Sequence, residues 1–150
     1  NLEPLVGELP LVLASTGVRR HSGAVHSGLR ERWIAGDPEV VLGYLRAARL
    51  ARDAKTALLA GDWPAVGELM NENHAIQRDL GGSGQVNEEL IAAALSVGAW
   101  GAKLAGAGKG GTVIAAHEDP DYLARKLQEQ GAARVLRVVP SEGLVVEGQF

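Results

Sequence analysis

Continuous apolar runs predict the strands of this chain. The run at 9–14 is apolar throughout, which is typical of a buried central strand. Short apolar or β-branched runs at 102–105 and 112–116 predict two more strands. The segment 133–139 alternates around two arginines and predicts a half-exposed strand, and 144–147 predicts a final edge strand.

Apolar residues at helical spacing predict five helices, at 24–35, 38–60, 64–80, 88–97 and from the Asp119–Pro120 pair to Gly131. Asp37 with Pro38 suits the start of the second helix, and Asn87 suits the N-cap of the fourth. In the longest helix the stripe expected to be buried is Val41, Tyr44, Leu45, Ala48, Ala51 and Leu58. Because the helices cluster mid-chain without long β-α-β alternation, we predict an α+β fold, an antiparallel sheet with helices on one face.

Composition narrows the classes of function. A length of 150 residues suits one domain, 1–150, that buries about 68–70% of its unfolded surface. The net charge is −3 and the only basic cluster is the Arg19–Arg20 pair, which argues against nucleic-acid binding. The chain has no cysteine, no apolar run long enough to span a bilayer and no visible signal peptide, so we expect a cytoplasmic location and no membrane contact. It starts at Asn1 rather than Met, as a trimmed piece of a longer protein would.

The most distinctive stretch is 101–111, with the sequence Gly-Ala-Lys-Leu-Ala-Gly-Ala-Gly-Lys-Gly-Gly, in which a glycine-rich loop at 106–111 follows the strand predicted at 102–105. Its Gly-x-Gly-x-x-Gly spacing matches the dinucleotide fingerprint, but a strand follows instead of the required helix. A Walker A loop is excluded because Gly110, not Ser or Thr, follows Lys109. The alternative is a glycine-rich hairpin that binds no ligand. The four clustered glycines and the absence of Asn or Asp turn residues favour a loop that approaches a ligand.

Polar residues gather at two other places. The segment Thr16–Gly23 follows the first strand and contains Arg19 and Arg20. Their guanidinium groups could bind a phosphate or a carboxylate, and a solvated turn explains the two arginines equally well. Asn73 and Gln77 lie on an otherwise apolar helix face, so they either tie helices together or face a cleft. His74 has no second histidine at ligand spacing, so we assign it a structural role and predict no metal site.

The glycine-rich stretch resembles the third conserved motif of the GHMP kinases, which commonly runs Lys-Leu-Ser/Thr-Gly-Ala-Gly-Gly-Gly-Gly. The order of elements is similar to the ferredoxin-like C-terminal domain of that family along nearly the whole chain. Four stretches look most like the glucuronokinases: 22–27, 30–33, 69–73 and 98–103. The start Thr-Gly-Val-Arg-Arg at 16–20 looks more like heptose and mevalonate kinases.

The resemblance implies phosphoryl transfer from ATP, with Mg²⁺, to an alcohol of a small metabolite. It implies a phosphate-adjacent set consisting of Lys103, Gly106, Ala107, Gly108, Lys109, Gly110 and Gly111. It implies an acceptor-binding set consisting of Thr16, Arg19, Arg20, His21, Ser22 and Asn73.

The chain departs from the family pattern at three points. Ala105 replaces the usual hydroxyl residue, and Lys109 replaces a glycine. The main ATP loop, Pro-x-x-x-Gly-Leu-Gly-Ser-Ser-Ala, occurs nowhere in the chain, and the catalytic aspartate normally precedes this region. We therefore assign no catalytic residue and expect the N-terminal kinase domain to be the partner of this one.

Three functions remain open at this point. The first is the C-terminal domain of an ATP-dependent kinase acting on a sugar, a sugar acid or a related alcohol, inactive without its ATP-loop domain. The second is a stand-alone ferredoxin-like ligand-binding or regulatory module, since this fold hosts many functions. The third is an oligomerisation domain with Trp33, Trp63 and Trp100 at an interface, although core packing is the expectation for each of them.

Overall fold

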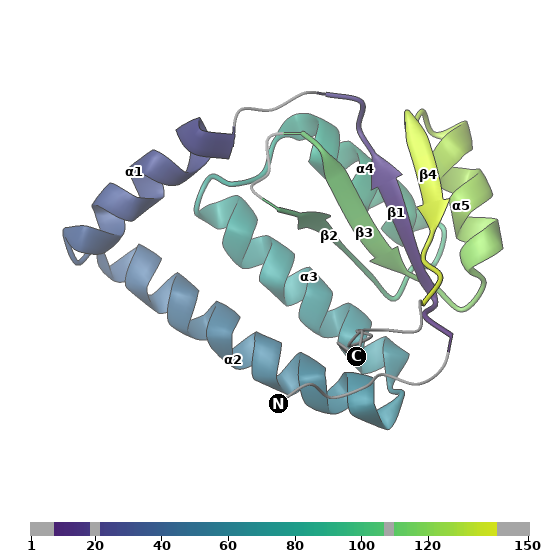
Figure 1. Cartoon of the computed structure of the whole chain (residues 1–150), viewed down its shortest axis with the longest axis horizontal. Helices are drawn as coiled ribbons and strands as arrows, with labels where there is room; N and C mark the ends of the chain where they lie inside the picture. Colours follow the sequence, from purple (N-terminus) through teal and green to yellow (C-terminus); the bar gives the residue numbers. More distant parts are fainter. Residues whose placement is uncertain (1–7, 19–21, 107–109, 141–150) are drawn as a thin grey trace, which may run out of the picture.

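The computed structural model describes residues 8–18, 22–106 and 110–140, without the side chains of 22–27. The described elements, in chain order, are β1 (Leu11–Ser15), α1 (Ser22–Ile34), α2 (Pro38–Ala60), α3 (Trp63–Asp79), α4 (Gln85–Ser96), β2 (Gly101–Ala105), β3 (Thr112–Ala116), α5 (Pro120–Glu129) and β4 (Arg134–Arg137) (Figure 1). These bounds lie close to the predicted ranges. The strand predicted at 144–147 lies outside the described residues.

The four strands form one antiparallel sheet in the order β2-β3-β1-β4. Because β1 pairs with β3 on one side and β4 on the other, the prediction that the first strand is central is confirmed. The order of elements along the chain is that of the ferredoxin-like fold: a strand, a helical connection, two strands, a helix and a last strand. The first connection contains four helices, α1 to α4, in place of one. The predicted α+β class is therefore confirmed.

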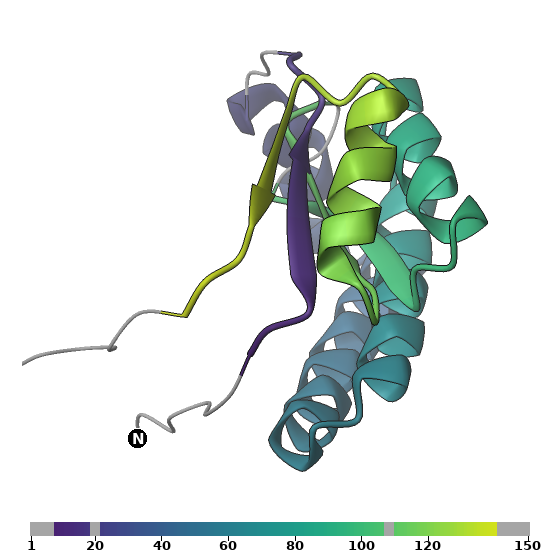
Figure 2. The same ribbon diagram turned by 90° about the vertical axis from the view of Figure 1, so that its right-hand side faces the viewer.

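The core lies between the sheet and its helices. Alternate strand residues, among them Val12 and Ala14 of β1 and Val113 of β3, are fully buried and pack with Leu90 of α4 and Leu123 of α5. This alternation is the period-two pattern of a sheet with one covered face. Figure 2 shows the sheet close to edge-on, with α4 and α5 on the same side of it.

Aspartates begin three of the helices, as their spacing predicts. The Asp37, Asp62 and Asp119 side chains accept hydrogen bonds from backbone N–H groups of the first turns that follow them. The predicted cap of the fourth helix was wrong, because α4 starts at Gln85 with Gly84 as its N-cap residue. Asn87 lies instead inside the first turn of α4, fully buried.

The stripe predicted to be buried in the longest helix was also wrong. The buried residues of α2 are Val40, Gly43 and Leu50, whereas Tyr44 is 40% exposed and Leu45 is 59% exposed. The α2 helix has apolar residues on two sides, and its buried residues lie on the side that packs against α3. The expectation that Trp33 packs in the core was also wrong. Trp33 is 44% exposed, and its ring packs on that of Tyr44 in α2 with the centroids 5.3 Å apart.

Helix α3 runs along β2 at very short range. The backbones of α3 and β2 come into direct contact at Gly67 and Gly101. A Cβ on Gly67 would lie 2.5 Å from the Trp100 carbonyl carbon. The Asn71 amide then bonds the edge of β2, accepting from the Ala102 N–H at 2.9 Å and donating to the Trp100 carbonyl at 3.2 Å. A side chain thus takes the place of a neighbouring strand and closes an open sheet edge. This contact fixes the position of the strand that leads into the glycine loop.

Candidate functional site

Thr16 joins the end of β1 to the exit of the glycine loop. Its hydroxyl oxygen accepts the Gly111 N–H at 2.9 Å and the Val18 N–H at 3.2 Å. Its own N–H donates to the Gly111 carbonyl at 2.8 Å. Two segments separated by 95 positions, which the sequence resemblance placed at one site, are therefore in direct contact.

Glycines are required at this junction. Gly110 has φ +115° and Gly111 has φ +94°, conformations that side-chain-bearing residues rarely adopt. A Cβ on Gly110 would also lie 3.1 Å from Val18, so the loop exit packs tightly on the segment after β1. At the loop entry Gly106 has φ +87° and is exposed. The described ends of the loop thus turn sharply, with the entry exposed at Gly106 and the exit buried at Gly110.

Lys103 lies on β2, three positions before the loop. Its neighbours Ala102 and Leu104 point into the core, so its side chain leaves the sheet on the opposite face. The ammonium donates to the Leu104 carbonyl at 3.0 Å and is half-buried. Burial lowers the pKa of this lysine, and no carboxylate of the described residues acts on it.

Asn73 and Lys103 line one cavity of about 210 Å³ between α2, α3 and β2. The other residues that line it are apolar: Leu50, Ala51, Ala54, Leu69 and Met70. The sequence resemblance placed Asn73 with the acceptor and Lys103 with the phosphates, and the structure brings both to the same cavity.

The remaining predicted residues cannot be placed. Arg19, Arg20, His21, Ala107, Gly108 and Lys109 lie outside the described residues. Ser22 is the first residue of α1, and its side chain is not described.

Asn71 is the positioning residue that sequence reasoning missed. The stretch 69–73 was noted for its likeness to a family, yet only Asn73 was selected from it. The sequence does show an amide side chain at position 71, two positions before Asn73. Its role can be inferred only when β2 is known to lie at the edge of the sheet.

The structural role assigned to His74 agrees with its surroundings. Its ring is buried, and Nε2 lies 2.9 Å from a Glu88 carboxylate oxygen that also accepts the Ser83 hydroxyl. These contacts tie the end of α3 to the first turn of α4.

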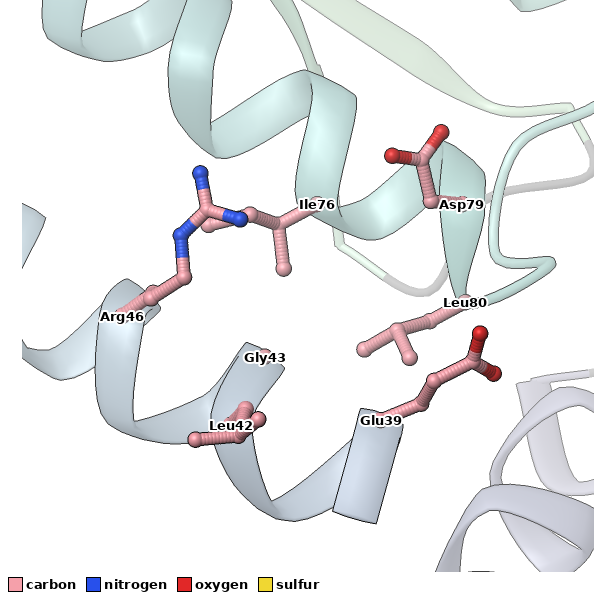
Figure 3. A pocket seen from close by; sticks show the side chains of 7 residues that line it. All are labelled: Glu39, Leu42, Gly43, Arg46, Ile76, Asp79 and Leu80. Atoms are coloured by element: carbon pink, nitrogen blue, oxygen red, sulfur yellow. The ribbon is translucent and has the colours of Figure 1, made fainter.

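A second cavity, of about 280 Å³, lies between the first half of α2 and the end of α3 (Figure 3). Its carboxylates are already paired: Glu39 with Arg32 at 3.0 Å and Asp79 with Arg78 at 3.2 Å. No residue from the predicted site lines it, so it lies outside the candidate site.

Neither a membrane span nor a metal cluster is found in the part of the chain that the structure describes. No helix there has the length and apolar content that crossing a bilayer requires. Nor do three histidine or acidic side chains converge there in a way that would hold an ion.

The fold and the site define an α+β domain that presents a glycine loop beside a polar strand end. The protein-family model described as "GHMP kinases C terminal" matches residues 54–133. This match spans more than half of the chain, and the chain belongs to the GHMP kinase family.

Curated relatives come from two branches of that family. The chain is 38% identical over 112 residues to probable glucuronokinase 2 of Arabidopsis thaliana, covering 73% of this chain and 30% of the relative. It is 31% identical over 147 residues to mevalonate kinase of Pyrococcus furiosus, covering 93% of this chain and 44% of the relative. The chain therefore spans less than half the length of these relatives.

Solved structures support the same fold. The L. major mevalonate kinase in complex with R-mevalonate aligns with a TM-score of 0.82 and 26% identity, over 90% of this chain and 44% of that one. The Lactococcus lactis galactokinase complexed with galactose aligns with a TM-score of 0.62 and 22% identity, over 85% and 42%, and shows the fold alone.

Proposed function

We propose that this chain forms the C-terminal domain of an ATP-dependent kinase that phosphorylates a hydroxyl group of a sugar, a sugar acid or a related alcohol, in the manner of a glucuronokinase. The observation that carries the proposal is the contact between Thr16 and Gly111, because it joins the acceptor-side segment to the glycine loop. The 38% identity to a glucuronokinase and the 31% identity to a mevalonate kinase support the kinase class without selecting the acceptor.

The backbone of the glycine loop is the part of the chain suited to phosphate. Successive N–H groups of a tight glycine turn form an anion-binding concavity, and glycine allows close approach. In phosphoryl transfer the protein acts mainly by positioning the phosphates and neutralising their charge. Thr16 supports the first role by fixing the loop exit, and the backbone N–H groups of the loop would supply the second.

ATP and Mg²⁺ complete the reaction in this proposal. The described residues contain no cluster of acidic side chains fit to hold Mg²⁺, so the ion has no binding residue here and no step is assigned to it. The ATP loop and the base come from a preceding kinase domain, which we propose as the partner of this one. The acceptor is an anionic small molecule, for which Arg19 and Arg20 supply matching charge.

ADP release tests this proposal. The complete protein, incubated with ATP, Mg²⁺ and a panel of sugars, sugar acids and mevalonate, is expected to release ADP with one acceptor class. The 150-residue chain alone is expected to show no turnover, because the ATP loop is missing from it. Turnover by the 150-residue chain would contradict the division of labour proposed here.

The alternative is a stand-alone ligand-binding module with the same fold. It is favoured if the complete protein releases no ADP with any acceptor on the panel yet binds one of them in calorimetry. The tight junction between Thr16 and the loop would then serve ligand binding alone.

A further inference from the structure

The cavity between α2, α3 and β2 has a composition that selects for one kind of ligand. Its wall is made of aliphatic side chains and one thioether, Met70, and its polar groups are the Lys103 ammonium and the Asn73 amide. The ammonium donates to the Leu104 carbonyl at 3.0 Å, and the Asn73 amide lines the same cavity. One cation and one amide therefore face an otherwise apolar space.

The charge in this cavity is not neutralised by the described protein. A half-buried ammonium without a carboxylate is costly, and burial lowers the pKa of Lys103 accordingly. An anion that entered the cavity would restore the missing charge partner, and charge-assisted hydrogen bonds are the stronger ones.

We propose that this cavity binds a small aliphatic anion, a branched carboxylate or its equivalent, with the anionic group on Lys103 and Asn73 and the hydrocarbon against α2 and α3. The cavity volume of about 210 Å³ limits the ligand to a small molecule. Polyhydroxylated anions are disfavoured, because their hydroxyl groups would meet Leu50, Ala51 and Ala54 and stay unpaired.

The test of this site stands whether or not the proposed kinase reaction is confirmed. Its ligand is either a phosphoryl acceptor with few hydroxyl groups or a separate effector, and the chemistry that recognises them is the same. The cavity lies beside the strand that leads into the glycine loop, so occupancy of either kind is positioned to influence that loop.

Met70 offers a direct readout, because it is the single methionine of the 150-residue chain. A ¹³C-methyl methionine label therefore gives one NMR signal from the cavity wall. The probe is 3-methylbutanoate, which has seven non-hydrogen atoms. Its charge control is the neutral 3-methylbutanamide, and its polarity control is glycerate, an anion of the same size with two hydroxyl groups.

We expect a saturable shift of the Met70 signal with 3-methylbutanoate and much weaker binding of both controls. Lys103→Leu should weaken binding about tenfold or more, as loss of a charged hydrogen bond does. Ala54→Leu should abolish binding by filling the cavity while keeping the lysine. Lys126 lies on α5 and pairs with Glu129, so Lys126→Leu removes an equal charge at a distance and should leave binding unchanged.

Two results would overturn the proposal: no saturable shift with the probe, or equal affinity in the parent, Lys103→Leu and Ala54→Leu proteins. Equal binding of glycerate would refute the selection for an aliphatic ligand. Where the complete protein releases ADP, inhibition by the probe competitive with the acceptor identifies the acceptor as the natural occupant, and non-competitive inhibition identifies an effector. Failure of the kinase proposal leaves the NMR titration intact.

Discussion

At the scale of single residues, Thr16 is the position where one side-chain atom connects the two parts of the candidate site. Thr16→Val keeps the shape of the side chain and removes the acceptor of the Gly111 N–H. Because that N–H would then lack a partner in a half-buried position, we expect unfolding to become easier by about 1–2 kcal/mol. Urea denaturation of the 150-residue chain measures this loss.

Thr16→Ser is the matched control, since it keeps the hydroxyl and loses one methyl group. We expect it to restore most of the stability, and in the complete protein to keep the KM for ATP near that of the parent while Thr16→Val raises it. Equal behaviour of the two variants would mean that the hydroxyl does not hold the loop.

The sequence predicted Thr16 but not Asn71, and the difference is physical. Thr16 stands at the end of an apolar strand, where ligand-binding residues often lie, and the family resemblance adds it to the acceptor-binding set, a role that stays a prediction. Asn71 acts across 29 and 31 positions, on the exposed edge of β2. A single sequence does not reveal which strand is at the edge, so an amide that closes that edge looks like any other polar residue on a helix.

At the scale of elements, the crossing of α3 and β2 depends on two facing glycines. A Cβ on Gly67 would lie 2.5 Å from the Trp100 carbonyl carbon, and backbone cannot move aside as a flexible side chain does. Gly67→Ala should therefore push α3 away from β2, strain the two Asn71 hydrogen bonds and cost about 2–3 kcal/mol of stability. Denaturant unfolding with circular dichroism detects this loss.

Gly28→Ala is the control for that substitution. Gly28 lies inside α1, and a Cβ there would have no atom within 4 Å. Alanine is the better helix former, so this variant should gain about 0.5–1 kcal/mol. If Gly67→Ala left the stability of the chain unchanged or raised it, as Gly28→Ala is expected to do, the close backbone contact between α3 and β2 would be contradicted.

Helix boundaries were well predicted, whereas the buried faces were not. Aspartate caps and terminal glycines are local signals, so α2 was predicted from Pro38 to Ala60 as observed. The face of α2 is a tertiary property: apolar residues line two sides of this helix, and the buried residues Val40, Gly43 and Leu50 lie on the side that packs against α3. Asn87 shows the same limit, since a residue suited to capping was buried inside the first turn instead.

At the scale of the whole molecule, α1 stands apart from the layered core. It packs mainly against α2, while α3, α4 and α5 all contact the sheet (Figure 1). Among its described side chains, Trp33 is 44% exposed and Ile34 is 66% exposed, so its C-terminal end is only weakly packed. Local stability follows such contacts, because a segment with few buried neighbours opens without unfolding the rest.

Hydrogen exchange should therefore divide this chain into two levels of stability. In the 150-residue chain we expect amides of α1 to exchange about tenfold faster or more than those of α4, whose Leu90, Ile91 and Ala94 are buried in the core. Mass spectrometry of peptides covering 22–34 and 85–96 makes the comparison, with α5 as a second core reference. Equal protection of α1 and α4 would show that α1 unfolds only with the core. If α1 becomes protected in the complete protein and not in this chain, then its exposed apolar end is covered there by another part of that protein.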